Sequence, residues 1–423
     1  MNLSSRFYFN YRRFVKWLSF FTAIVGPGII VMLADNDAGG ITTYILTGAL
    51  FSFSFLWIIV AIEPAAYVCQ EMTVRLGALT KRGHAEAIFE AFGSFWGWFS
   101  LLDLVLTDFL TIVTEFIGMT VAARVFGLPP VITTIATIAL IMGMVLSGRY
   151  WTWEKIVLVF CFLNLIYIPA AFLVNVPLGP VLSGLIPNIP PGGFSSNYVF
   201  YVMANLGTTI APWMIFFQQS SVVDKGLKEK DIGFSRWDTA SGVIFNLVAT
   251  CFIIIIAAAI IPGVAVNDAA QAAIKMMSIN KIVADCTLIG LFDAGFLGAI
   301  CISLASSWAW GEVFGWPHSL NHPVKAAPAF YLYRLIILVL AGAIVLIPGA
   351  PLVLITLYVQ VVAVTLLPAA LTFLLILLNQ KEVVGERWVN SRRQNILTVA
   401  IIASIIVMST IFALSAIFPH LLG

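Results

Sequence analysis

Long hydrophobic segments separated by short polar loops run along the whole chain. A helix that crosses a bilayer needs about 20 mostly apolar residues, and the pattern predicts eleven such spans. Their expected bounds are Trp17–Gly48, Leu50–Val74, Ser94–Val121, Val131–Leu146, Trp153–Val174, Tyr198–Val223, Ala240–Ile261, Asp285–Val313, Ala329–Ile347, Leu352–Leu378 and Ile396–Phe418. We therefore expect an all-α membrane protein that forms a single polytopic domain over residues 1–423.

Two of these spans contain residues that an uninterrupted membrane helix disfavours. The first span carries the run Asp35-Asn36-Asp37-Ala38-Gly39-Gly40, and the sixth carries Gly207-Thr208-Thr209-Ile210-Ala211-Pro212. Glycine permits unusual backbone angles and proline removes a hydrogen-bond donor, so we expect both helices to unwind at these points. Paired broken spans in the two halves of a chain indicate the substrate site of a transporter.

Composition and charge agree with a membrane protein. Hydrophobic residues make up 61% of the chain and charged residues 10%, whereas soluble domains carry about 25% charged residues. The net charge of +2 gives no reason to expect a nucleic-acid partner. All of the 22 Lys and Arg residues except Arg124, Lys275 and Lys281 fall in alternate loops, beginning with the N-terminal segment. By the positive-inside rule we expect a multi-pass protein of the cell (inner) membrane, with a cytoplasmic N-terminus and an extracellular or periplasmic C-terminus.

The first break also places a carboxylate, Asp37, at membrane depth, where ionisable groups are costly and usually functional. Pro212 leaves carbonyl oxygens without helical donors in the second break. One carboxylate with several carbonyl oxygens makes a site for a hard cation. The chain has no HExxH, P-loop or GxSxG pattern, and its five cysteines contain no CxxC pair. We therefore expect neither an enzyme nor a bound cofactor, and a metal ion would be the transported substrate.

Several motifs resemble those of the NRAMP metal transporters. Gly26-Pro27-Gly28-Ile29-Ile30, with Asp37-Ala38-Gly39-Gly40 nine residues after Gly28, is similar to the family's first helix, where an Asp-Pro-Gly-Asn motif stands at the same spacing. Further similarities follow in the same order along the chain, at residues 70–77, residues 115–118, residues 207–220 and Gln360. The resemblance implies a LeuT-like inverted repeat of five plus five helices in which helices 1 and 6 are broken. The repeats would cover about residues 17–175 and 198–379, followed by an extra helix at about 396–418.

The resemblance also implies a metal site, and the departures from it bear on which metal binds. The family's Asp, Asn, backbone carbonyl and Met ligands correspond here to Asp37, Gly40, Thr208 and Ala211, and Gln360 adds an amide oxygen in some states. The thioether is lost, and oxygen ligands suit Mg²⁺, Ca²⁺ and Mn²⁺. Smaller side chains enlarge the cavity, which suits Mg²⁺ because this ion retains several of its waters. We therefore expect a member of the NRAMP-related magnesium transporters that prefers Mg²⁺ and accepts Mn²⁺.

Titratable groups that the resemblance associates with proton movement are replaced. The third-helix Asp is Ile112 here, and the sixth-helix histidine pair falls on Trp213 and Gln218, so we expect alternating access without proton coupling. Glu115 remains, and Asp108 lies two helical turns before it on the same helical face. Glu115, Asp108, Trp213 and Gln218 are the candidate residues of the ion pathway.

Two alternative functions stay open. One is a proton-coupled NRAMP importer of Mn²⁺ or Fe²⁺, and the other is an amino-acid transporter of LeuT-like fold in which Asp37 binds the substrate amine. The expected partners are a divalent metal ion and the lipid bilayer. The sequence does not define an oligomeric state and is compatible with a monomer.

Overall fold

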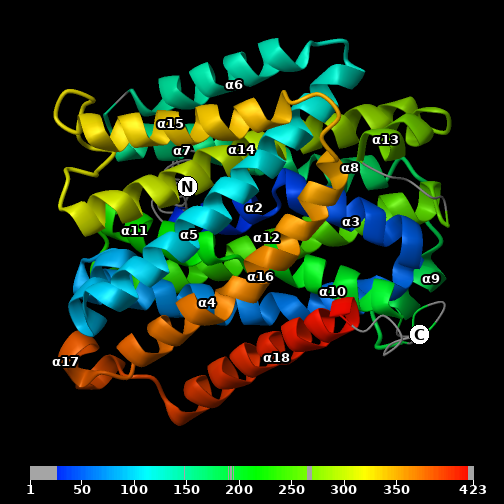
Figure 1. Cartoon of the computed structure of the whole chain (residues 1–423). Helices are drawn as coiled ribbons and strands as arrows, with labels where there is room; N and C mark the ends of the chain where they lie inside the picture. The colour runs from blue at the N-terminus through cyan, green and yellow to red at the C-terminus, as the bar shows by residue number, and fades with distance from the viewer. Residues whose placement is uncertain are drawn as a thin grey trace, which may run out of the picture.

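Helices fill the part of the chain that the structure describes (Figure 1). The structure, a computed structural model, describes residues 26–417 apart from Ser147, Ile189, Pro191, Gly192, Phe194 and residues 264–268. The first half contains α2 (Pro27–Asp35), α3 (Ala38–Phe51), η1 (Ser52–Phe55), α4 (Leu56–Thr80), α5 (His84–Val125), α6 (Pro130–Val145), α7 (Tyr150–Leu163), η2 (Asn164–Ile166), α8 (Tyr167–Ala171) and α9 (Leu178–Gly184). The second half contains α10 (Ser196–Thr209), α11 (Pro212–Lys225), η3 (Glu229–Asp231), α12 (Ile232–Ile260), α13 (Ala269–Met277), α14 (Lys281–Phe314), α15 (Pro328–Val345), α16 (Leu352–Leu377), α17 (Lys381–Val384), η4 (Glu386–Trp388) and α18 (Arg392–Ile417).

The expected all-α membrane architecture is confirmed, and each predicted span coincides with one helix or with consecutive helices. The first span corresponds to α2 and α3, the fifth to α7 through α8, and the sixth to α10 and α11. Nine helical stretches of the described chain are long and apolar enough to cross a membrane, with α3 and α4 joined in one of them, and α6 is shorter. The start of the first span, before Gly26, and Phe418 at the end of the last span lie outside the described residues.

Several helical segments were not predicted, among them α9, α13, α17 and the first segment of α5. The short helices α9 and α13 lie in connections that lack the length of an apolar span. The third span begins ten residues earlier than expected, because α5 starts at His84 and Gly93, at φ 81°, separates a first segment from the rest of the helix. A side chain at this left-handed angle would be strained, and glycine adopts it freely.

The broken helices lie in the interior of the bundle. In Figure 1, α6 and α15 run together along one side, α18 lies along the other, α16 crosses diagonally between them, and α2 is near the middle. The long helices α5 and α14 pack against each other, and α3 contacts both of them as well as α10 and α12. The ends of α2, α3 and α10 at the two breaks are therefore enclosed by other helices.

The start of α2 is held by Asp238 of α12. The Asp238 carboxylate accepts hydrogen bonds from the backbone N–H groups of Gly26 (2.9 Å), Gly28 (2.7 Å) and Ile29 (3.3 Å). These donors belong to the first turn of a helix, which has no intrahelical acceptor for them, and a carboxylate is favourable there. Gly28 allows the close approach, since a Cβ atom at this position would lie 2.6 Å from the backbone nitrogen of Thr239.

Replacement of Asp238 by Ala should therefore destabilise the protein. The change leaves up to three buried N–H groups without an acceptor, and hydrogen bonds to charged groups contribute about 1.5–3 kcal/mol each. Removal of the buried carboxylate also relieves its desolvation, so we expect the free energy of unfolding to fall by about 2–4 kcal/mol, less than the sum of three such bonds. The melting temperature of the purified protein in detergent, followed as loss of the monodisperse elution peak on heating, reports this change. Asp238→Asn should give a smaller loss, and Glu382→Ala, at an exposed position of α17, should give almost none. An unchanged melting temperature for Asp238→Ala would contradict this role.

Candidate functional site

The first break consists of Asn36 and Asp37, between the end of α2 and the start of α3. Asn36 forms a reciprocal pair with Asn164 of η2, in which the Asn36 amide donates to Asn164 Oδ1 (2.8 Å) and the Asn164 amide donates to the Asn36 carbonyl (3.1 Å). The Asn164 amide thus supplies a hydrogen-bond donor for the Asn36 carbonyl at the break. Backbone groups at membrane depth need such partners within the protein. The break is thus a defined conformation held by neighbouring side chains.

Two carboxylates face the N-terminus of α3. Asp37 Oδ1 accepts the Gly40 N–H (2.6 Å) as an N-cap, and Glu115 Oε2 accepts the Ala38 N–H (3.0 Å). Both side chains are buried, and both lie against the same glycine of α14, Gly298. The positive end of a helix dipole and its free N–H groups attract anions, so they stabilise this pair when no metal is bound.

The second break consists of Ile210 and Ala211, between α10 and α11. The carbonyl of Thr208 would normally accept the N–H of residue 212, but this residue is proline, so the carbonyl has no helical donor. The Ala211 N–H donates to the sulfur of Met214 (3.3 Å). The sequence predicted an oxygen-only site, and the structure places this thioether one turn from the position where the family's Met ligand is missing.

The two breaks meet across closely packed glycines. A Cβ atom at Gly40 would overlap the Thr208 hydroxyl, and one at Gly39 would overlap the Gln360 amide. At Gly298 of α14, a Cβ atom would lie 2.8 Å from Glu115 Cδ and 3.2 Å from Asp37 Cβ. Asp37, Thr208, Gln360 and Glu115 therefore converge on one buried region.

One interpretation of the sequence is wrong. Gly39 and Gly40 do not unwind the first span, because both lie in the first turn of α3 and neither has a positive φ angle. The absence of their side chains instead lets Thr208 and Gln360 approach the start of the helix.

The remaining candidate residues lie at different distances from this region. Ala211 and Trp213 lie at the second break, and the Trp213 indole N–H has no hydrogen-bond partner. Gln218, farther along α11, donates to Thr239 of α12 (3.0 Å). Asp108 is fully buried with neither carboxylate oxygen hydrogen-bonded, and it lies near Tyr333 of α15. The structure does not bring Gln218 or Asp108 to the breaks, and the roles assigned to all these residues stay predictions.

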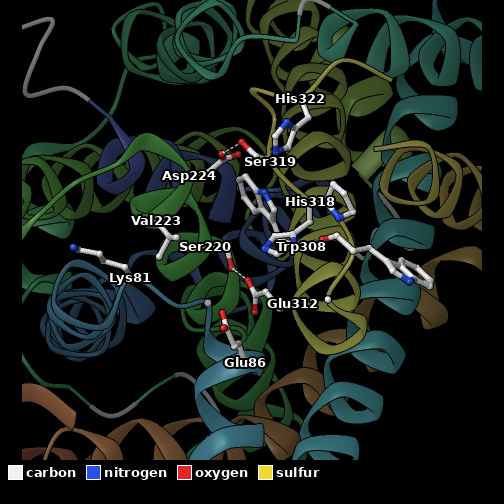
Figure 2. Close-up of a pocket in the computed structure, with 14 residues that line it drawn as sticks. Lys81, Glu86, Ser220, Val223, Asp224, Trp308, Glu312, His318, Ser319 and His322 are labelled. Carbon is white, nitrogen blue, oxygen red and sulfur yellow. Dashed lines mark hydrogen bonds between the residues drawn. The ribbon is translucent and has the colours of Figure 1, made fainter. Parts of the chain in front are cut away.

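A cavity lies on each side of the converging residues. The first, here called the Glu312 cavity, has a volume of about 540 Å³ and is lined by Glu86, Ser220, Asp224 and Glu312 among others (Figure 2). The second, the Thr356 cavity, has about 410 Å³ and is lined by residues that include Thr42, Gly118, Arg124, Leu291 and Thr356.

The order of residues along two helices places the breaks between these cavities. Along α5, Glu86 lines the Glu312 cavity, Glu115 faces the breaks and Gly118 lines the Thr356 cavity. Along α14 the order is reversed, from Leu291 through Gly298 to Glu312. The two cavities therefore approach the same buried region from opposite ends of the bundle.

Aromatic side chains separate the breaks from the Glu312 cavity. The rings of Trp213 and Phe217 have centroids 5.9 Å apart, and those of Phe217 and Trp308 have centroids 5.6 Å apart. All three side chains are buried, and Trp308 lines the cavity. The packed rings thus extend from Trp213 at the second break to Trp308 at the wall of this cavity.

Sequence reasoning missed several residues that shape the site. Among them are Asn164, Met214 and Gly298, and the hydroxyl of Thr114, which lies 3.4 Å from Glu115 Oε1. An acid one residue after a threonine gives no distinctive signal, and neither does a lone asparagine in an apolar span. Among the described residues, no three His, Cys, Asp or Glu side chains are grouped so that they could hold a metal ion. The oxygens available at the breaks include those of Asp37, Glu115, Gln360, the Thr208 hydroxyl and the α10 backbone.

An all-helical membrane bundle with two interrupted helices around a buried carboxylate is typical of the LeuT-like fold class. Solved structures of this class are similar to the chain. A manganese transporter from Eremococcus coleocola matches with a TM-score of 0.76 and 19% identity, over 94% of this chain and 88% of that one. MhsT in complex with L-phenylalanine matches with a TM-score of 0.59 and 14% identity, over 92% of this chain and 98% of that one. At these identities the likeness concerns the fold.

The chain belongs to the NRAMP family, since the model described as natural resistance-associated macrophage protein-like matches residues 28–415. Among curated relatives, the divalent metal cation transporter MntH of Klebsiella pneumoniae is 27% identical over 226 residues, which are 52% of this chain and 54% of the relative. The MntH protein of Yersinia pestis is 29% identical over 219 residues, 49% of this chain and 51% of the relative. The chain thus matches about half the length of these relatives.

A side chain at Gly298 should disturb the site directly. In Gly298→Ala the added methyl group would press on the Glu115 carboxyl group, which accepts the Ala38 N–H, and on Asp37. We expect Mn²⁺ affinity, measured by calorimetry on purified protein, to fall at least about tenfold, which corresponds to about 1.4 kcal/mol. Gly143→Ala is the matched control, because nothing lies within 4 Å of a Cβ atom there. Equal affinities for the two variants would show that these carboxylates do not bind the metal.

Proposed function

We propose that this protein transports divalent metal cations across the cell membrane by alternating access, with Mg²⁺ preferred and Mn²⁺ accepted. The observation that carries the proposal is the buried Asp37 carboxylate at the first break, opposite Thr208 and Gln360. A carboxylate at membrane depth is costly unless a charge compensates it, and the surrounding oxygens suit a hard cation. Asp37 would supply the charge, the Thr208 carbonyl and the Gln360 amide would supply further oxygens, and Gly40 and Ala211 would leave space for water.

The preference for Mg²⁺ rests on the ligands and on the small residues. Position 211 carries a methyl group in place of a thioether, and the nearby Met214 sulfur accepts a backbone N–H. A site of oxygens and water suits Mg²⁺, which sheds its waters reluctantly, whereas sulfur ligands favour softer ions. The names of similar proteins, a divalent metal cation transporter and a manganese transporter, support the broader substrate class.

The two cavities support the alternating-access mechanism. The Glu312 cavity lies at the end of the bundle that carries Lys81, and we assign this end to the cytoplasm by the positive-inside rule. The Thr356 cavity would then open to the outside. The rings of Trp213, Phe217 and Trp308 would have to separate before an ion could pass from Asp37 to the cytoplasmic cavity.

We also propose that transport is not coupled to protons. The three positions where the family resemblance implies titratable groups carry Ile112, Trp213 and Gln218. The buried Ile112 side chain and the Gln218 amide, which donates to Thr239, have no titratable group, so neither position takes up a proton. Besides the proposed ligand Asp37, the resemblance retains Glu115, which is held by the Ala38 N–H. A single polytopic domain built from two repeats and an extra helix, with no catalytic activity, completes this proposal.

Uptake into proteoliposomes with a pH-sensitive dye in the lumen tests the function. The parent should accumulate Mg²⁺ and Mn²⁺ without acidifying the lumen beyond that of empty vesicles, and Asp37→Ala should accumulate neither ion while eluting as a folded protein. Removal of the buried carboxylate relieves its desolvation but leaves the Gly40 N–H without its acceptor, so the elution profile of this variant must show that it is folded before its uptake is interpreted. Normal Mg²⁺ uptake by Asp37→Ala would exclude the assigned site. Metal-dependent acidification would support the proton-coupled importer, and uptake of amino acids without any metal would support an amino-acid transporter.

Ala211→Met should shift selectivity away from Mg²⁺. The longer side chain fills space that hydrated Mg²⁺ needs and adds a soft ligand that Mn²⁺ tolerates better. Excess Mg²⁺ should block Mn²⁺ uptake in the parent and should block it at least about tenfold less effectively in the variant, a difference of about 1.4 kcal/mol. Ala211→Leu is the control for volume, since it narrows the site without adding sulfur. If Mg²⁺ competes equally well in all three proteins, position 211 does not determine selectivity.

A further inference from the structure

A second pair of buried carboxylates lies beside the first break and has no role in the proposed transport site. Asp35 is the last residue of α2, and Glu63 lies in α4, next to Pro64. Each is only 1% exposed. Both side chains accept hydrogen bonds from the same amide nitrogen, Asn246 Nδ2 of α12, at 3.4 Å from Asp35 Oδ2 and 3.1 Å from Glu63 Oε1. The two acids therefore lie on either side of a single neutral donor.

No basic side chain compensates this pair among the described residues. None of the ion pairs formed there includes Asp35 or Glu63. The ionisable groups that act on the pair from neighbouring helices are Tyr44 of α3, Cys251 of α12 and Asp37 at the break, and none of these carries a positive charge. Buried charges in proteins are paired with an opposite charge or coordinate a metal ion.

Three buried oxygen atoms on Glu63, on Asn246 and on the helix face of Asn246 have no hydrogen-bond partner. Glu63 Oε2 and Asn246 Oδ1 are buried and have no partner, and the same holds for the hydroxyl of Thr250, one turn from Asn246 on α12. Rotation of the Asn246 amide would exchange its nitrogen for its oxygen, since the two are nearly equal in shape. A proton shared between Asp35 and Glu63 would bond to only two oxygens, whereas a metal cation would engage several of them.

We propose that Asp35, Glu63 and Asn246 form a binding site for one monovalent metal cation, with Na⁺ as the fitting ion. The ligands would be the two carboxylates, the turned Asn246 amide oxygen and the Thr250 hydroxyl. A divalent ion is disfavoured here because Asp35 lies only two residues before Asp37, the proposed ligand of the transported ion. Repulsion scales with the product of the charges, so two divalent ions at this separation repel twice as strongly as one divalent and one monovalent ion.

The short distance between the sites makes them antagonistic. A divalent ion at Asp37 raises the positive potential at Asp35, so it should weaken Na⁺ binding, and by linkage Na⁺ should weaken divalent binding by the same factor. This coupling rests on the proposed transport site, whereas the Na⁺ site itself does not.

Binding of ²²Na⁺ to the purified full chain, in slightly alkaline choline buffer without divalent ions, tests the site. The parent should bind one Na⁺ per chain. Glu63→Gln keeps the shape of the side chain and removes its charge, and it should lower Na⁺ affinity at least about tenfold. Thr250→Val removes only one hydroxyl and should lower it about threefold, which keeps the test valid if Glu63→Gln fails to fold. Asp293→Asn removes another buried carboxyl group that has no hydrogen-bond partner and should bind Na⁺ as the parent does.

Saturating Mg²⁺ tests the coupling. It should weaken Na⁺ binding to the parent by a factor in the range of about 5–150 that is typical of coupled sites, and it should have no effect on Asp37→Ala. Absence of Na⁺ binding to the parent, or unchanged binding to Glu63→Gln and Thr250→Val, would overturn the site. Equal displacement of Na⁺ by Mg²⁺ in Asp37→Ala would show that the pair binds divalent ions, which would overturn its assignment to a monovalent cation. Na⁺ binding by a protein that transports no divalent ion would overturn the proposed function and leave this site intact.

Discussion

Backbone N–H and C=O groups inside a bilayer must be bonded within the protein, because no water is present to replace a missing partner. This constraint determines the surroundings of both breaks. The free N–H groups at the start of α3 engage Asp37 and Glu115, and the free N–H of Ala211 engages the Met214 sulfur. The two carboxylates that could bind a substrate, Asp37 and Glu115, are therefore already bonded to backbone N–H groups. An arriving ion must compete with these bonds, which limits how tightly it can be held and favours its later release.

The architecture could be predicted from the sequence because most spans are long apolar runs between short polar loops, and the breaks could be predicted because Asp37 and Pro212 are exceptional inside such runs. The packing between the breaks could not. Gly39, Gly40 and Gly298 carry no side chain, and their effect depends on which neighbour lies opposite each one. A sequence does not specify these neighbours, so the glycines were interpreted as points of unwinding when they are points of close contact.

Candidate acids were recognised by their depth in the membrane, which does not distinguish their surroundings. Asp108 and Glu115 lie on the same helix, yet only Glu115 reaches the N-terminus of α3. Neither Asp35 nor Glu63 has a distinctive signal in the sequence, because Asp35 lies in the same polar run as Asp37 and Glu63 is one of several acids within the spans. Their common partner, Asn246, lies 183 residues beyond Glu63. Contacts of such long range depend on the tertiary arrangement of the helices, which no local pattern encodes.

The hold of Asp238 on the start of α2 has a consequence for how the molecule can open. Three hydrogen bonds join the first half-helix to α12, and Gly28 brings their backbones into contact. We therefore expect α2 and α12 to move together during any conformational change. At the end of the bundle that carries the Glu312 cavity, the contact between α11 and α14 includes a hydrogen bond between Ser220 and Glu312 at the cavity wall (2.5 Å). Because α2 is tied to α12, we expect an opening at this end to separate α11 from α14 at the Ser220–Glu312 hydrogen bond and the Phe217–Trp308 ring contact, and to leave the contact between α2 and α12 intact.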